Sequence, residues 1–380
     1  MDTQTPLTLL GGLSARQFMQ RYWQKKPLLV RNAMPGFQPM LSRSALMQMA
    51  ERDAVESRLI VHGPKGWKLS HGPMRRRSLP PLTQPRWTLL VQGVDLHDDR
   101  VHGLMQQFRF VPDARLDDVM ISYATDGGGV GPHFDSYDVF LIQAHGQRRW
   151  RYGRQKNLSL EPNVPLKILT NFVPEFDEVL DPGDMLYLPP RYAHDGVAVG
   201  ECMTYSVGFR VPQVHGLGQE LVRNALDAQD DEPAVPVLYR DPGQAAVEAP
   251  AQLPESLRAF ARAAVQKRLH ALERDTTLLD QMLGETLTEP KPRTWFEPSE
   301  PMPVGDAVRV LLDRRSRMLY DDRHVFINGE SYRAAGADAR LMRELADQRQ
   351  LAAGRLAGAS GAARALLLDW SEAGWVHLVD

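Results

Sequence analysis

The sequence is poorest in cysteine, because its 380 residues include a single one, Cys202. One cysteine cannot form an intramolecular disulfide and cannot build a cysteine-based zinc site. Such sparing use of cysteine is typical of proteins in a reducing compartment. We therefore expect a cytoplasmic protein.

Long apolar runs and an excess of one charge sign are also missing. No stretch approaches the roughly 18 consecutive apolar residues of a membrane-spanning helix, and residues 1–14 lack the basic and apolar regions of an export signal. The formal net charge is −2, so no global positive field favours binding to nucleic acid, although a local basic patch stays compatible with it. The sequence predicts neither export nor a membrane span, and it carries no strong nucleic-acid signal.

The length and the changes of pattern along the chain indicate several domains. With 380 residues the chain exceeds one compact core, so we expect two or three domains. From Leu28 to about Val211, short alternating or apolar runs separated by Gly and Pro predict an all-β barrel or sandwich, preceded by a short helix over residues 14–25. We place the domains at residues 1–212, 213–295 and 296–380. The last of these mixes short strands and helices, which suits a winged-helix-like module.

The middle region is predicted to be helical over residues 213–228 and from Pro254 to about Leu287. The second helix carries one apolar stripe, which is consistent with helix–helix packing. The stripe consists of Leu257, Phe260, Ala261, Ala264, Val265, Leu269 and Leu272. It fits either the core of a small bundle or a dimer interface.

The chemistry of the chain is concentrated in the segment GGGVGPHFDSYDVF and in a histidine about sixty residues later. His133 and Asp135 are two residues apart, so on a strand their side chains point to the same side. His194 follows a Gly/Pro turn and can complete a face of two imidazoles and one carboxylate. Such a facial triad leaves positions open for a 2-oxo acid and O₂ on Fe(II), which suits non-haem oxygenases. These three residues are therefore the predicted metal ligands and catalytic centre.

A second His-x-Asp pattern, formed by His97 and Asp99, lies in the polar run DLHDDR. We interpret it as a solvated turn, because no Gly-rich loop precedes it and no apolar strand follows it. It is not predicted to bind a metal.

A 2-oxo diacid needs a cation for its distal carboxylate. In the run RRWRY, strand alternation places Arg148 on the same face as Trp150 and Tyr152, and the aromatic face is expected to point into the barrel. Arg148 is therefore the predicted anchor. Thr204 and Ser206 alternate on the strand CMTYSVGF and either line the cosubstrate pocket or serve packing.

Taken together, these motifs resemble the JmjC-type ribosomal oxygenases, and in particular their bacterial arginine-hydroxylase branch. The resemblance is carried by the spacing Phe18-x₃-Tyr22-Trp23-x₂-Lys26-Pro27, by GGGVGPHFDSYDVFLIQ, by RRWR, by PGDMLYLPP, by YSVGFRVP and by NGE at residues 328–330. These motifs extend along nearly the whole chain. The resemblance implies a mainly β, partly α protein: a JmjC (cupin-type) double-stranded β-helix, then a helical dimerisation region, then a winged-helix domain.

The resemblance also implies an activity, namely hydroxylation at Cβ of an arginine in ribosomal protein uL16, with O₂ and 2-oxoglutarate consumed. It implies Fe(II) bound by His133, Asp135 and His194, Arg148 on the cosubstrate, and a homodimer. The chain has Ala124 where relatives place a serine, so Ser122 is expected to substitute, and Thr204 stands in place of an asparagine. An arginine substrate needs acceptors and aromatic faces, for which Tyr137 and Asp138 are the candidates.

Other functions stay open. A histidine hydroxylase of another ribosomal protein or a lysine demethylase would use the same metal and cosubstrate. A cupin isomerase or small-molecule dioxygenase would need neither Arg148 nor the helical regions. A ligand-sensing module that binds nucleic acid would need a basic surface on residues 300–380, which the near-neutral charge does not favour.

Overall fold

The structure is a computed structural model that describes residues 2–228, 237–242, 251–300 and 304–379. The chain divides into two compact units. The first unit comprises Met1–Val211 with Pro292–Trp295, and the second comprises Pro212–Lys291 with Phe296–Asp380. In the structure, the predicted helical region and the C-terminal strands and helices form one unit. The boundary between the second and third predicted domains therefore remains a prediction.

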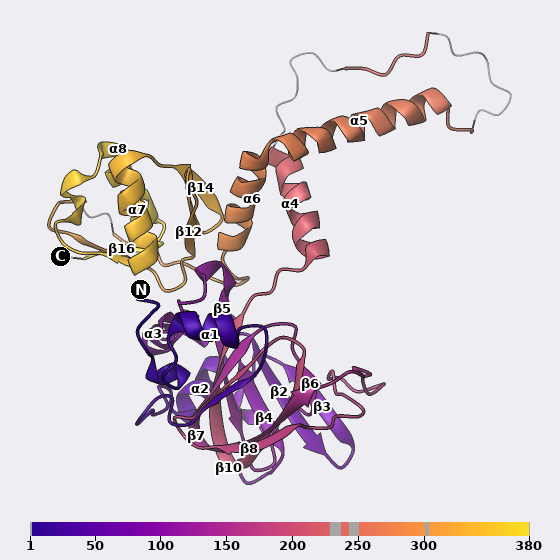
Figure 1. The fold of residues 1–380 in the computed structure, drawn as a ribbon, viewed down its shortest axis with the longest axis vertical. Coiled ribbons are helices and arrows are strands. Elements are labelled where there is room, and N and C mark those ends of the chain that lie inside the picture. Colours follow the sequence, from indigo (N-terminus) through magenta and orange to yellow (C-terminus); the bar gives the residue numbers. More distant parts are fainter. Residues whose placement is uncertain (1, 229–236, 243–250, 301–303, 380) are drawn as a thin grey trace. The chain divides into compact units, whose positions relative to one another are not determined.

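The first unit is built around one antiparallel sheet of ten strands that curls into a barrel and has β1 and β3 at its two edges (Figure 1). Its strand order is β1-β9-β7-β10-β5-β4-β2-β3, with β6 paired to β10 and β8 paired to β7. The strands are β1 (Leu28–Val30), β2 (Ser57–Gly63), β3 (Gly66–His71), β4 (Trp87–Val91), β5 (Leu116–Ala124), β6 (His133–Phe134), β7 (Val139–Arg154), β8 (Phe176–Leu180), β9 (Met185–Leu188) and β10 (Tyr192–Phe209). The predicted β-barrel is thereby confirmed.

Two strands of the barrel are unusually long. β7 has 16 residues and β10 has 18, and two short runs of the sequence, VFLIQ and RRWRYG, lie on the one strand β7. The two strands pair along most of their length, and their register shifts between Val199 and Met203. At this bend Gly146 has φ +58°, and a Cβ there would collide with the carbonyl oxygen of Glu201. Only glycine lets the strands bend at this point.

The two faces of the barrel wall differ in what they contact. Along β5, Ile121 and Tyr123 belong to the large apolar cluster that also contains Phe18 of the N-terminal helix. Ser122 and Ala124 alternate with them and point to the barrel interior, as the strand periodicity requires. Helices cover the outer face, and the inner face is left for the site.

Three α-helices belong to this unit: α1 (Ala15–Arg21), α2 (Arg43–Ala50) and α3 (Asp99–Gln106). The predicted N-cap Ser14 is confirmed, since its hydroxyl and the side chain of Gln17 form a capping box. The expectation that residues 28–211 hold strands only was wrong, because α2 and α3 lie there. Their signals were the caps Ser42 and Asp98, whose side chains accept backbone N–H groups.

The second unit begins with α4 (Val214–Ala228), α5 (Glu255–Arg274) and α6 (Thr276–Thr288). It continues with β11 (Arg309–Leu312), β12 (Met318–Tyr320), β13 (His324–Ile327), β14 (Glu330–Arg333), α7 (Gly336–Gln348), β15 (Gln350–Leu351), α8 (Gly361–Glu372) and β16 (Val376–Val379). The single helix expected from Pro254 to Leu287 is two helices, because Asp275 caps α6 through the backbone N–H of Leu278. No described helix has the length and apolar character needed to cross a membrane.

The apolar stripe of α5 is buried at one end only. Leu272 is buried against Ala225 and Met282, so the bundle-core interpretation holds there. Further along the helix, Leu257, Phe260, Val265 and Leu269 are 37 to 58% exposed, and the Phe260 ring contacts Tyr239 edge-to-face. Most of the stripe is therefore left exposed by the residues that the structure describes.

Asp313 ties together the strands of the C-terminal module and makes its stability depend on pH. The carboxylate is 3% exposed and accepts hydrogen bonds from Arg315 and from Nε2 of His377. Burial raises its pKa, but the bonds from His377 and Arg315 outweigh it and hold the pKa of Asp313 well below the ordinary value. The folded form therefore binds this proton less readily than the unfolded chain, so the stabilisation exists above the unfolded pKa and is lost as the pH falls below about 4.

We expect Asp313→Ala to lower the free energy of unfolding by about 3 kcal/mol at pH 7, and by less at pH 3, in urea titrations.

Candidate metal and cosubstrate site

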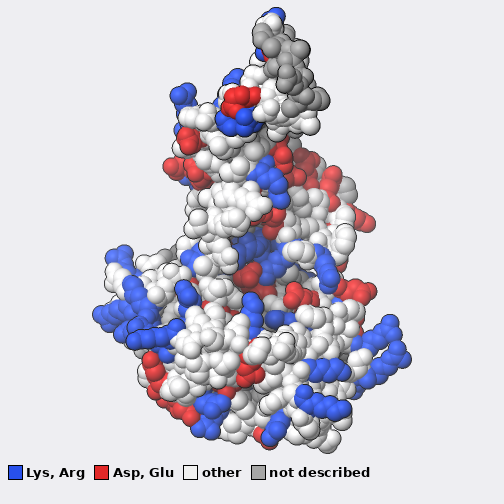
Figure 2. Space-filling model, turned by 90° about the vertical axis from the view of Figure 1, so that its right-hand side faces the viewer, with Lys and Arg blue, Asp and Glu red and all other residues white. Residues whose placement is uncertain are grey.

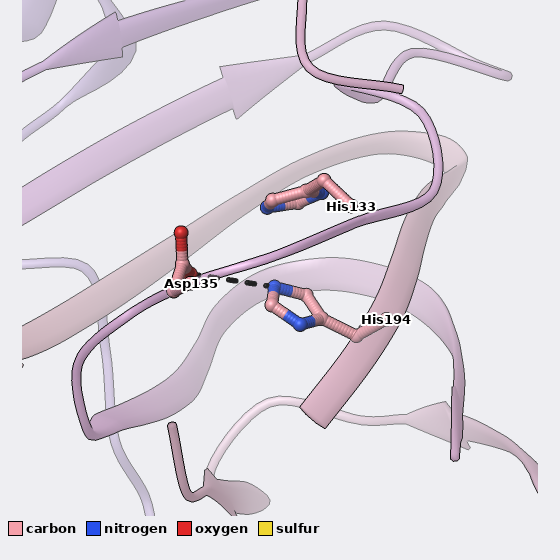
Figure 3. Close-up of side chains that lie close together, drawn as sticks. All are labelled: His133, Asp135 and His194. Carbon is pink, nitrogen blue, oxygen red and sulfur yellow. Dashed lines mark ion pairs between the residues drawn. The ribbon is translucent and has the colours of Figure 1, made fainter. Parts of the chain in front are cut away.

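Three side chains converge inside the barrel near the start of β10 (Figure 3). One ligand atom each of His133, Asp135 and His194 lies within 4.8 Å of the others. His133 on β6 pairs in register with His194 on β10, and Asp135 follows β6 directly. Nε2 of His194 is 3.6 Å from Oδ2 of Asp135, and the two imidazole centroids are 4.2 Å apart. Among the described residues, these three form the cluster of potential ligand side chains that could hold a metal.

Both histidines are held in the tautomer that a metal needs. Nδ1 of His133 lies 2.8 Å from the carbonyl oxygen of Gly131, and Nδ1 of His194 lies 2.9 Å from that of Tyr192. Each Nδ1–H can donate to a backbone carbonyl, which leaves Nε2 unprotonated for a metal. Burial, with the charge of His133, lowers the pKa of His194 to about 4, so this ring is neutral at neutral pH. Two imidazoles and a carboxylate fit Fe(II) with an open face.

The polar run at His97 has a different role. Asp98 caps α3, accepting backbone N–H groups of Arg100 and Val101, and it pairs with the guanidinium of Arg100. His97 lies at the end of the preceding turn. The pattern predicted to be a solvated turn is thus the end of a turn and the start of α3.

Arg148 lies on the inner face of β7, as strand alternation predicts. It is 5% exposed, whereas Arg149 on the opposite face is exposed and pairs with Asp177. Nε and Nη2 of Arg148 are buried and have no hydrogen-bond partner among the described residues, and its guanidinium carbon is 5.6 Å from the Trp150 ring centre. A buried cation without a partner is costly, so this position calls for an anion.

Arg148 is also placed at a suitable distance from the triad. It pairs in register with Ala198, and His194 pairs with Tyr152, so four residues of strand separate the two positions. At about 3.3 Å per residue that is roughly 13 Å between backbones, which an arginine side chain and a short diacid can span together. The triad and the cation thus lie on the same face of the sheet, at a separation that a short diacid and an arginine side chain can bridge.

Two of the hydroxyl groups predicted to line the cosubstrate pocket donate hydrogen bonds to neighbouring residues of the barrel. Ser122 donates to the carbonyl oxygen of Thr204 at 3.4 Å, and Thr204 donates to Oε1 of Gln143 at 2.9 Å. Ser206 is 6% exposed. Ala124 contacts Ala198 and Cys202, and Thr88 pairs with it in register from β4. Thr88 is a buried hydroxyl that the sequence reasoning missed.

The two residues predicted for a substrate side chain are in different places. Tyr137 is 39% exposed, and burial of its hydroxyl together with the neighbouring carboxylates of Asp135 and Asp118 raises its pKa. Asp138 is wholly buried, accepts hydrogen bonds from the Tyr187 hydroxyl at 2.6 Å and from Gln24 at 2.9 Å, and belongs to the packing under the N-terminal helix. Asp138 is therefore a packing residue and not a substrate contact, because its carboxylate oxygens accept hydrogen bonds inside the fold.

Two charged residues near Tyr137 were not predicted from the sequence. Asp118 is 7% exposed and accepts the backbone N–H of Gly93. Arg58 donates to Oε1 of Gln92 at 2.7 Å. Both lie in phase with inward-facing positions of β5 and β2, so alternation could have identified them.

Two known domain families match parts of this chain. Residues 103–217 match the JmjC domain, and residues 271–377 match the ROXA-like winged helix. The fold and the site together define a JmjC protein with a C-terminal winged helix.

Individual relatives narrow this further. The chain is 42% identical over 201 residues to the ribosomal protein uL16 3-hydroxylase of Escherichia coli and 38% identical over 204 residues to a probable ribosomal oxygenase of Haemophilus influenzae. These alignments cover 53% of this chain, and the chain spans about half the length of these curated relatives.

Solved structures match over nearly the whole chain. The X-ray structure of E. coli ycfD superposes with a TM-score of 0.81 at 30% identity, covering 97% of this chain and 98% of that one. E. coli YcfD in complex with cobalt and 2-oxoglutarate has a TM-score of 0.78 at 30% identity, covering 96% and 98%. The chain belongs to the family of JmjC-domain ribosomal oxygenases.

Proposed function

We propose that this chain is an Fe(II)- and 2-oxoglutarate-dependent oxygenase that hydroxylates Cβ of an arginine in ribosomal protein uL16. The observation that carries the proposal is the presence, beside a facial triad, of the buried cation Arg148, whose Nε and Nη2 have no hydrogen-bond partner among the described residues. A structural zinc site would need neither the open face nor the cation. The E. coli relative named as a uL16 3-hydroxylase supports the substrate.

The residues of the chain divide the work between metal, cosubstrate and substrate. His133, Asp135 and His194 would hold Fe(II), and the bound metal would supply the activation of O₂ by 2-oxoglutarate, with one oxygen atom going to the substrate and the other to succinate, and with CO₂ released. Arg148 binds the distal carboxylate of 2-oxoglutarate. Ser122, Thr204 and Ser206 form the adjoining wall, where Gln143 orients the Thr204 hydroxyl. The protein's contribution is to position the reactants and to exclude water.

A cationic substrate side chain is favoured by the charges around Tyr137. The carboxylates of Asp135 and Asp118 and the guanidinium of Arg58 all lie near the phenol, and the Tyr137 ring offers an aromatic face. A guanidinium gains from the ring and from two carboxylates set against one cation, whereas a neutral imidazole gains little from a carboxylate. We therefore propose that the substrate arginine lies against the Tyr137 ring, and the histidine-hydroxylase alternative is the second choice.

We further propose that the chain works as a homodimer in the cytoplasm. The uncovered part of the α5 stripe, from Leu257 to Leu269, is an apolar surface of the kind that a second copy covers. A ribosomal protein as substrate, like the single cysteine, fits the cytoplasm.

The direct test is mass spectrometry of uL16 incubated with the purified chain, Fe(II), ascorbate and 2-oxoglutarate. We expect one arginine to gain the mass of one oxygen atom, and fragmentation to place it at Cβ. The matched control is the Asp135→Ala variant, which should leave uL16 unmodified.

Other outcomes would change the proposal in defined ways. Oxygen on a histidine of another ribosomal protein, with uL16 unchanged, would replace arginine hydroxylation by histidine hydroxylation. If no ribosomal protein stimulated succinate formation, the oxygenase proposal itself would fail.

A further inference from the structure

One stretch of the barrel is strongly basic although the chain as a whole is not. Residues 57–94 contain seven Lys and Arg residues and neither Asp nor Glu. The stretch is a tenth of the chain, and an even spread of the 47 acidic residues would place about five in it. The local excess of positive charge is hidden in the net charge of −2.

Six of these cations are exposed and form what we call the basic edge. Its members are Lys65, Lys68, Arg75, Arg76, Arg77 and Arg86. No ion pair or side-chain hydrogen bond joins any of them to another residue that the structure describes. Glu51 accepts the backbone N–H of Arg76, and among the described residues the Arg76 guanidinium has no acidic partner.

The basic edge follows the outermost strand of the barrel sheet, β3. Lys65 lies in the turn between β2 and β3, Lys68 lies on β3, and Arg75 to Arg77 follow the other end. Arg86 joins at the turn end, where its carbonyl accepts the N–H of His62. Figure 2 views the side of the molecule on which β2 and β3 lie in Figure 1 and shows groups of Lys and Arg side chains on the lower part of this surface.

The length of β3 suits a polyanion. Six residues of strand extend about 20 Å, which equals about six phosphate spacings along one stacked nucleic-acid strand. Charged side chains also protect an edge strand from pairing with other chains. That explanation covers Lys68 but not Arg75, Arg76 and Arg77, which lie beyond the strand.

An aromatic pair lies at the same edge. The rings of His62 and Trp67 are stacked, with centroids 4.1 Å apart and planes within 6°; His62 is exposed and Trp67 is half-buried. Cations interleaved with exposed aromatic rings are the usual surface for single-stranded nucleic acid. The indole of Trp67 also borders Gly131, two residues before the metal ligand His133. The basic edge therefore adjoins the loop that leads into the site.

We propose that the basic edge binds single-stranded RNA through its phosphates, with the His62–Trp67 pair offering a surface for base stacking. A substrate protein that presents an arginine is repelled by such a surface, whereas RNA carried by a ribosomal protein is attracted to it. The binding does not depend on the proposed reaction. The role that we propose for RNA binding is to bring the site to a ribosomal protein that already contacts RNA. This role rests on the proposed function.

The test is fluorescence anisotropy of a labelled single-stranded RNA of about 20 nucleotides with the full chain, between about 50 and 200 mM KCl. We expect log K to fall with log salt with a slope of up to about −4, because single strands lose about 0.7 per phosphate contact. Arg75→Glu/Arg76→Glu/Arg77→Glu should bind at least about tenfold more weakly, with a slope smaller by about 2. The glutamine triple should weaken binding less, and thermal melting of both triples shows that they fold.

The matched control reverses three exposed cations of the other unit, Lys267, Arg333 and Arg340, and should change the RNA affinity less than twofold. Absence of RNA binding at about 50 mM KCl would overturn the proposal. An equal loss of RNA affinity in the 75–77 glutamate variant and in this control variant would also overturn it. So would binding to phosphatidylserine vesicles without binding to RNA. Because the readout is RNA affinity, these results stand apart from the test of hydroxylation.

Discussion

Replacing His194 with alanine is expected to lower hydroxylation of uL16 by at least about a thousandfold, since the metal then keeps two protein ligands. His194 is 3% exposed and lies within ligand distance of both His133 and Asp135. Its neutral state at neutral pH makes it a ligand without a cost of deprotonation. The measurement is succinate formation together with the affinity for Co(II), followed by its visible absorption.

The matched control for this variant is His97→Ala, in the other His-x-Asp pattern of the chain. His97 ends a turn before α3, outside the cluster of possible metal ligands, so its loss should leave the Co(II) affinity unchanged. A His194→Ala variant that still binds Co(II) like the parent chain would contradict the assignment of the triad.

Replacing Arg148 with methionine is expected to raise the KM for 2-oxoglutarate about a hundredfold, because charge-assisted hydrogen bonds to the distal carboxylate are lost. The same change should not lower the melting temperature of the chain without cosubstrate, since it removes a buried cation with two unpartnered nitrogen atoms. In the parent chain, 2-oxoglutarate should raise the melting temperature, and in the variant this effect should vanish.

Arg149→Met is the matched control, one residue away on the opposite face of β7. Its guanidinium pairs with Asp177 at the surface, so we expect less than a twofold change in KM. Equal effects of the two substitutions, or a variant at Arg148 that still gains stability from 2-oxoglutarate, would show that another cation holds the carboxylate.

Much of the site could be predicted because it is local in the sequence. His133 and Asp135 are two residues apart on an extended segment, and Arg148 shares its strand face with Trp150. A period of two is a property of the backbone, so it identifies which side chains share a face before the partners of the strand are known. The helix start at Ser14 was predictable for the same reason, since a cap acts within one turn.

Asp138 shows where local reasoning ends. The residue follows the metal motif directly, yet its carboxylate lies under Tyr187 and Gln24, which are distant in the sequence. Asp118 and Arg58 come near Tyr137 only through the pairing of β2, β4 and β5. Which side chain of a strand meets which ligand depends on this pairing, because neighbours across a sheet can be far apart in the chain.

The sequence by itself determined the candidate metal ligands, the barrel class and the inward position of Arg148, because each rests on residue type and short-range periodicity. The tertiary structure decided how β7 and β10 bend, which acidic residues lie near Tyr137, and which part of the α5 stripe is exposed. It also placed the basic residues of 57–94 along one edge strand beside the site. These features depend on the register and packing of segments distant in the chain, which no short window of sequence contains.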